Sequence, residues 1–299
     1  DPAWWRQWDM RQIGMPTAWE QSQGDAVVIA LVDTGVDARH PDLAGNLLAG
    51  YDFINEDNDP QDDNGHGTHV AGILAAMGNN GIGIAGMAWR AKVMPLKVLD
   101  AKGDGSYFNI IRAIRYAADH GARIINLSLG GSFHDPNLQE AVAYARAKGC
   151  LVVAAAGNTY HLDNHPIYPA MYPGVIAVAA VGAHDEHAYY STTGDFVDVA
   201  APGGNSEGSR RVFSIYGDGL SRGYAWGEGT SFAAPHVAGM AALLRSVQPS
   251  LSQLRVAEII TSTAQDRGAP GWDPEYGWGR VDVFQALIRA AVASLRVEP

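Results

Sequence analysis

The chain has 299 residues, and 47% of them are hydrophobic, which is enough to bury one large core. Asp and Glu total 32 against 21 Lys and Arg, and the resulting charge of −11 disfavours nucleic acid and favours cations as partners. No apolar run reaches the length of about eighteen residues that a membrane-spanning helix requires. No linker or low-complexity tract interrupts the chain, so we expect one domain over residues 1–299.

The first residue is Asp1 rather than Met, and we therefore expect a mature form from which a signal peptide and a pro-segment have been removed. The single cysteine, Cys150, excludes an internal disulfide. It opens an apolar run, and nothing near it in the sequence would lower its pKa. We expect Cys150 to be a small buried side chain rather than a catalytic thiol.

Continuous apolar runs without alternation predict strands that are buried on both faces of a sheet. These runs are residues 26–33, 92–100, 122–131, 150–158 and 174–182. Residues 109–121 and 137–149 lie between strands and have helical periodicity, with Gly121 and Gly149 as C-terminal caps. The alternation predicts an α/β fold of three layers, in which a mostly parallel sheet carries helices on both faces.

Four polar residues are predicted along the edge of this sheet where its strands end. Asp33 and Asn158 each end an apolar run. His66 and Ser231 each follow a glycine-rich turn and open a helical pattern, over residues 64–77 and 229–244. We expect Pro235 in the first turn of the second of these helices, where the missing N–H costs nothing.

Acyl transfer by a serine requires a base, a carboxylate that orients the base, and donors for the oxyanion. His236 follows Ser231 by five residues, about 140° around a helix, so it does not serve as the base. Each other motif alone has a simpler interpretation. Asp33 could cap a turn, Ser231 could cap a helix, and His66 with His69 could be a metal pair, although no acidic residue accompanies them.

Together, "LVDTGVD", "NGHGTHVAG", "AAAGN" and "GTSFAAPHVAG" resemble the subtilisin-like serine proteases in content and in order. The resemblance covers nearly the whole chain. It implies that Asp33 orients the base His66, that Ser231 is the nucleophile, and that Asn158 donates to the oxyanion. It further implies a secreted, monomeric endopeptidase that acts on proteins or peptides, with its own pro-segment as folding aid and inhibitor. Neither nucleic acid nor a membrane is expected as a partner.

The same resemblance implies a groove that binds substrate as an extra strand. Ser128, Leu129 and Gly130 match the segment that pairs with substrate and forms one wall of the S1 pocket. Tyr107 and Ile110 match the S4 pocket, although Ile110 also belongs to the apolar stripe of its helix. Residues 159–167 depart from the family pattern, and residues 203–211 are an apparent insertion with two solvated arginines. We expect large apolar residues at P1.

Two structural calcium sites are expected. Residues 51–67 are dense in carboxylates, and a hard cation with oxygen ligands would relieve their repulsion; the alternative is a solvated acidic loop. An EF-hand is rejected because its twelfth position holds Thr68. The resemblance assigns one site to Asp52, Asp57, Asp59 and Gln61. It assigns the other to the side chains of Asp1, Asp42 and Asn80 and the carbonyls of Met77, Ile82 and Ile84.

Two other classes of function stay open at this point. The chain could be an inactive member of the family that serves as a peptide-binding module, or an esterase or transacylase that uses the same site. The intact motifs argue against the first alternative, and the relative turnover of peptides and esters separates the second.

Overall fold

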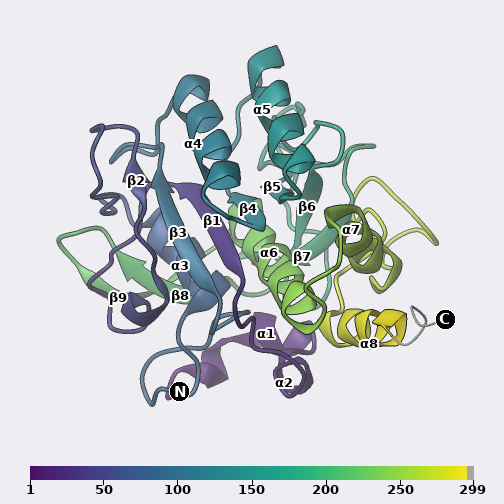
Figure 1. Cartoon of the computed structure of the whole chain (residues 1–299). Helices are drawn as coiled ribbons and strands as arrows, with labels where there is room; N and C mark the ends of the chain where they lie inside the picture. Colours follow the sequence, from purple (N-terminus) through teal and green to yellow (C-terminus); the bar gives the residue numbers. More distant parts are fainter. Residues whose placement is uncertain (295–299) are drawn as a thin grey trace.

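The computed structural model describes residues 1–294, and its centre is a seven-stranded parallel sheet (Figure 1). The strands are ordered β2-β3-β1-β4-β5-β6-β7, and each predicted run supplies one of the five strands β1, β3, β4, β5 and β6. Their bounds are β1 Val28–Asp33, β2 Tyr51–Asp52, β3 Lys92–Lys97, β4 Ile124–Leu127, β5 Leu151–Ala155, β6 Ile176–Val181 and β7 Val199–Pro202.

Helices cover both faces of the sheet, which confirms the predicted three-layer α/β fold (Figure 1). Along β1, Ile29 and Leu31 pack into the core shared with α3 and α6, whereas Ala30 and Val32 pack into the core shared with α4 and α5. Successive side chains of a strand point to opposite faces, so both faces of β1 must be apolar. The bounds are α3 His66–Ala75, α4 Tyr107–Asp119, α5 Pro136–Ala147 and α6 Thr230–Val247.

The remaining elements lie around this core. β8 and β9 form an antiparallel hairpin, and short helices at the start of the chain and two longer ones near its end complete the fold. Their bounds are η1 Trp4–Arg6, α1 Trp8–Gln12, α2 Met15–Ala18, η2 Ala44–Asn46, β8 Val212–Gly217, β9 Arg222–Gly227, α7 Gln253–Ser262 and α8 Val283–Ser294. Among residues 1–294, none of the helices combines the length and apolar character needed to cross a membrane.

Local sequence explains where the two predicted helices begin and end. The hydroxyl of Ser106 accepts a hydrogen bond from the backbone N–H of Asn109 at the start of α4, and the carboxylate of Asp135 caps α5 in the same way. Gly121 and Gly149 follow the ends of these helices with φ of +85° and +89°, as predicted. Cys150 is buried, also as predicted, and burial raises the pKa of its thiol.

Candidate active site

Asp33 is the last residue of the central strand β1, and its side chain is buried. Its Oδ1 accepts hydrogen bonds from Nδ1 of His66 and from the backbone N–H of Thr34, both at 2.7 Å. A Cβ at Gly67 would lie 2.1 Å from the carbonyl oxygen of Gly35, so a glycine there allows the first turn of α3 to pack against the turn that follows β1. This close approach brings the first residue of α3, His66, to Asp33.

The turn before His66 is organised by Asp62, whose role the sequence did not indicate. Its buried carboxylate accepts hydrogen bonds from the backbone N–H groups of Gly65 and Thr68 and from the hydroxyls of Thr34 and Thr68. An aspartate shortly before a helical pattern is a typical N-terminal cap, and that signal could have separated Asp62 from the other acidic residues of the loop.

Electrostatics at His66 favour a proton on its ring. Burial alone would lower the pKa of His66, but the negative charge and hydrogen bond of Asp33 outweigh it, so the pKa is raised above its ordinary value of 6.5. Within residues 1–294, no carboxylate pairs with His69, and burial, together with the charge of His66, lowers the pKa of His69 to about 3. Its ring packs on Phe232, with 4.3 Å between centroids, so His69 is a neutral core residue. The side chain of His66 keeps 26% exposure to solvent.

Ser231 is the second residue of α6, and Phe232 beside it packs on the ring of His66 with centroids 5.4 Å apart. A Cβ built at Gly229 would lie 3.6 Å from Oγ of Ser231 and 3.5 Å from Nδ2 of Asn158. The two predicted site residues therefore meet around Gly229.

The amide of Asn158 is oriented by Thr230, another residue that the sequence did not indicate. The backbone N–H and the hydroxyl of Thr230 both donate to Oδ1 of Asn158, each at 2.9 Å. In the described part of the chain, the NH₂ group of Asn158 is thereby left as a free donor on the side of Ser231. Of the four residues predicted at the sheet edge, Asp33 and His66 share a hydrogen bond and Ser231 and Asn158 meet around Gly229, and the contact of Phe232 with His66 connects the two pairs.

Pro235 lies deeper in α6 than expected. The helix begins at Thr230, so Pro235 is in its interior and lacks the N–H that would pair with the carbonyl of Ser231 in a regular helix. The hydroxyl of Ser128 donates to that carbonyl at 2.6 Å, and Ser128 in turn accepts from the amide of Asn126 at 2.9 Å. The expectation of a first-turn proline was wrong. Ser128 supplies the hydrogen bond that Pro235 cannot donate to the carbonyl of Ser231.

His236 is fully buried and points away from this centre. Its ring contacts the carboxylate of Asp9, at 3.1 Å, and the carbonyl of Phe232, at 2.8 Å. These contacts agree with the inference that His236 is not the base for Ser231.

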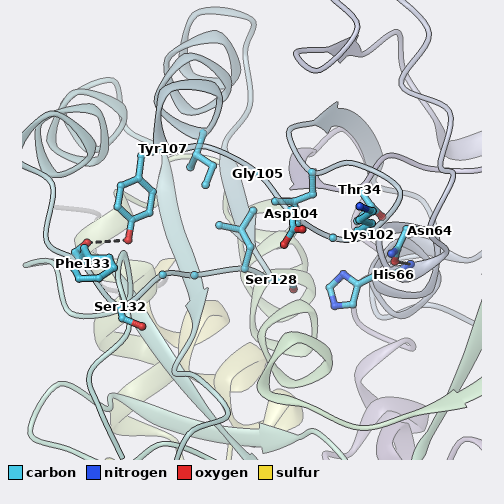
Figure 2. A pocket seen from close by; sticks show the side chains of 16 residues that line it. Thr34, Asn64, His66, Lys102, Asp104, Gly105, Tyr107, Ser128, Ser132 and Phe133 are labelled. Atoms are coloured by element: carbon cyan, nitrogen blue, oxygen red, sulfur yellow. Dashed lines mark hydrogen bonds between the residues drawn. The ribbon is translucent and has the colours of Figure 1, made fainter.

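A cavity of about 700 Å³ extends from His66 to Tyr107 and Phe133 (Figure 2). The predicted substrate residues all line it, namely Ser128, Leu129, Gly130, Tyr107 and Ile110. The hydroxyl of Tyr107 donates to the carbonyl of Phe133 at 2.8 Å and joins the two walls at the far end (Figure 2). Ile110 also packs into the core beneath α4, so both interpretations of this residue hold.

Comparison with known proteins identifies the family. The model of the subtilase family, peptidase S8, matches residues 24–279. The chain belongs to the subtilase family. Thermitase from Thermoactinomyces vulgaris is 45% identical over 282 residues, which cover 94% of this chain and 96% of thermitase. This subtilase is therefore a serine endopeptidase of the subtilisin type, as its motifs predicted.

Two further relatives come from other organisms. The minor extracellular protease Epr of Bacillus subtilis is 37% identical over 290 residues, covering 96% of this chain but 43% of Epr. Among solved structures, a protease from Pseudoalteromonas arctica superposes with a TM-score of 0.88 at 36% identity, covering 97% of this chain and 98% of that one. These neighbours agree with the fold of the subtilase described above.

The loop of residues 77–84 in the subtilase wraps around the residues predicted for one calcium site. The carboxylate of Asp1 accepts backbone hydrogen bonds from Asn79, Asn80 and Gly81, and Asp42 accepts one from the amide of Asn80 at 2.7 Å. The carbonyls of Met77, Ile82 and Ile84 belong to the same loop. Among residues 1–294, no Lys or Arg forms an ion pair with Asp1 or Asp42.

The residues predicted for the other calcium site are Asp52, which ends β2, and residues of the loop that follows this strand. The backbones of Asp52 and Asp57 exchange two hydrogen bonds, of 2.9 and 3.2 Å, and Asp57 caps the backbone of Asp59. Gln61 follows and donates to the carbonyl of Asp62. Within residues 1–294, no three His, Cys, Asp or Glu side chains gather in the manner of a metal centre, so amide and carbonyl oxygens would have to complete either site.

The apparent insertion, residues 203–211, is held by hydrogen bonds to Glu228, the residue that directly follows β9. Glu228 accepts hydrogen bonds from the backbone N–H and the hydroxyl of Ser206, at 2.6 and 2.7 Å. Arg210 and Arg211 are exposed, and Arg211 lies 3.6 Å from Glu228.

Proposed function

We propose that the endopeptidase works through an acyl-enzyme on Ser231, with His66 as general base and Asp33 as the carboxylate that orients it. The observation that carries this proposal is the 2.7 Å hydrogen bond from Nδ1 of His66 to Oδ1 of Asp33. It reserves Nε2 of the ring for the proton of Ser231 Oγ and stabilises the imidazolium that results. Oγ attacks the peptide carbonyl, and Nε2 then gives its proton to the departing amine.

Asn158 and the backbone N–H of Ser231 would bind the oxyanion of the tetrahedral intermediate. Thr230 supports this role, because its two hydrogen bonds to Oδ1 fix the amide before substrate arrives. A preorganised donor costs no reorganisation when negative charge develops. Water would then attack the acyl-enzyme, with His66 again accepting the proton.

The substrate backbone would lie along Ser128, Leu129 and Gly130 as an added strand, with the P4 side chain in the part of the cavity that Tyr107 and Ile110 line. Both sets of residues line one cavity with His66, and this supports the assignment. The large apolar P1 residue expected from the sequence would require an open S1 pocket.

We also propose two structural calcium ions. Asp42 is fully buried, and its negative charge together with burial raises the pKa of Tyr224. A buried carboxylate beside a loop rich in carbonyls fits a hard divalent cation. Asp1, Asp42 and Asn80, with the carbonyls of Met77, Ile82 and Ile84, would hold the first ion. It would fasten the N-terminus to the loop of residues 77–84.

Asp52, Asp57, Asp59 and Gln61 would hold the second ion, and the cation would have to draw the three carboxylates together, because they do not gather as a metal centre in the described part of the chain. Asp52 is buried at the end of β2. Within residues 1–294, the carboxylates of residues 52–63 form no ion pair with Lys or Arg apart from Glu56 with Arg112 and Asp63 with Lys97. Neither ion takes part in a chemical step. Their chemistry is to neutralise carboxylates and to stabilise the folded state.

We further propose that residues 1–299 form one catalytic domain that is secreted and acts as a monomer. Secretion is supported by the relative that is named an extracellular protease. A pro-segment would assist folding and inhibit the site, and proteins or peptides would be the substrates. Membership of the subtilase family supports proteins or peptides as the substrates.

The proposal is tested with a fluorophosphonate probe followed by intact mass and peptide mapping. Labelling should be confined to Ser231 and absent from the Ser231→Ala variant. Ser252 also lies at the start of a helix, α7, and Ser252→Ala is the matched control that should label fully. Asn158→Ala should fold and slow peptide turnover by about 10²–10³, the range for loss of one oxyanion donor.

Absence of labelling in folded wild-type protein would contradict the proposed nucleophile and leave a peptide-binding protein as the better account. Labelling at Ser231 without peptide turnover, but with ester turnover, would point to an esterase.

A further inference from the structure

Ile167 lies between two glycine segments near the active site. A Cβ built at Gly130 would lie 2.3 Å from Cγ2 of Ile167, and a Cβ built at Gly157 would lie 2.4 Å from its Cγ1. The two branches of this one side chain therefore reach the two segments, and only 8% of the residue is exposed. Ile167 fills the space that the missing side chains of Gly130 and Gly157 leave.

These two segments are the ones that flank the P1 side chain if the proposed mechanism holds. Gly157 directly precedes the oxyanion donor Asn158, and Gly130 belongs to the strand on which substrate would lie. With the scissile carbonyl at Ser231 and its oxygen at Asn158, the P1 side chain extends between the two segments. Two glycine walls would admit a flat aromatic ring, but the branched side chain of Ile167 occupies the gap.

Hydrogen bonds hold the backbone on both sides of Ile167, so the side chain cannot leave the gap between the two glycines without breaking them. Tyr168 and Gly131 exchange two backbone hydrogen bonds of 2.9 Å each. On the other side, the hydroxyl of Thr159 donates to the carbonyl of His165 at 3.0 Å. A β-branched side chain also has few rotamers available. A large P1 residue would thus have to displace a packed side chain from a fixed loop.

We propose that Ile167 closes the S1 pocket and restricts this endopeptidase to small P1 residues, namely glycine, alanine and serine. This inference rests on the proposed function and replaces the expectation of large apolar P1 residues, which came from the resemblance to the family and not from the altered loop of residues 159–167. A pocket discriminates by about 10-fold or more for each methylene that does not fit. Alanine at P1 should therefore be cleaved at least about 10-fold more efficiently than phenylalanine, as kcat/KM.

The test uses peptide p-nitroanilides that differ only at P1, with alanine, leucine or phenylalanine. The wild type should prefer alanine, and Ile167→Gly should reverse the order by opening the space between the two glycines. Ile167→Ala is the second variant and should shift the ratio part of the way. Leu162→Gly is the matched control, because Leu162 lies on the same loop but is 71% exposed; its ratio should equal that of the wild type.

Active-site titration with the fluorophosphonate probe separates the two ways of failing. No labelling and no turnover of any substrate would refute the proposed nucleophile. Normal labelling with phenylalanine preferred by the wild type would overturn the role of Ile167, whether or not the variants fold. An unchanged ratio in folded, labelled Ile167→Gly would overturn it as well.

Discussion

The hydrogen bond from Ser128 to the carbonyl of Ser231 predicts an energetic coupling between Ser128 and Pro235. Ser128→Ala removes the donor that serves this carbonyl and the acceptor that serves the amide of Asn126. Pro235→Ala restores a backbone N–H four residues after Ser231, which can donate to the same carbonyl. The second substitution should therefore offset part of the loss from the first.

The magnitude follows from the number of groups left unpaired. A buried polar group without a partner costs about 1–3 kcal/mol, so Ser128→Ala should lower the free energy of unfolding by at least that much. The rescue should equal one net hydrogen bond, about 0.5–1.5 kcal/mol. With an unfolding entropy near 2.1 cal/mol/K per residue, a chain of 299 residues changes Tm by about 1.6 °C for each kcal/mol.

Thermal and denaturant unfolding of all four members of the cycle measures this coupling. The Ser231→Ala background is used throughout, so that autolysis does not contribute. The same cycle with Ser106→Ala, which removes the cap of α4 and shares no partner with Pro235, should be additive within about 0.5 kcal/mol. If the Ser128 cycle is equally additive, the carbonyl of Ser231 does not need Ser128, and the reasoning about the helix interior is refuted.

Two further predictions concern protons and metal. Because the pKa of His66 is raised and only the neutral ring accepts the Ser231 proton, kcat/KM should fall as the pH drops through a midpoint above 6.5; a pH-rate profile with a lower midpoint contradicts this. Chelation with EDTA should lower Tm and speed autolysis. The loss in the free energy of unfolding should be up to about 4 kcal/mol for an ion present at a thousandfold its Kd. Asp42→Asn should remove the part of the EDTA effect on Tm that the first site contributes, and an unchanged Tm of the wild type with EDTA would refute both calcium sites.

Much of the sheet could be predicted because its strands are buried on both faces. The side chains on both faces of β1 are buried, so the apolar run of residues 26–33 is continuous and can be recognised in the sequence. β2 has two residues, too few to form a distinctive pattern. β7 is as short as β4, but its sequence, VAAP, has two alanines and a proline, which are weak strand formers. β9 alternates between exposed and half-buried positions, and no apolar run marks it. These elements depend on tertiary contacts rather than on local sequence.

The site divides in the same way. Asp33 ends β1 and Asn158 follows the end of β5 by three residues, so both could be placed, because parallel strands end at one edge of the sheet. Thr230 and Asp62 could not be assigned, because their roles come from hydrogen bonds to residues 72 and 28 positions away in the chain. Sequence distance hides such contacts even when each residue stands next to a recognised motif.

The S1 pocket is where this difference matters most for function. The motif around Gly130 and the run that ends at Asn158 place two walls of the pocket. These motifs are the same whichever side chain lies between the walls, so they do not predict the size of the pocket. What fills the gap depends on how the loop of residues 159–167 returns toward Gly131, and the backbone pairing of Tyr168 with Gly131 fixes that return. Moving the pairing by one residue would turn the side chain of Ile167 to the other side of the chain. Specificity in this subtilase is therefore set by the register of a loop, whereas the chemistry is set by motifs.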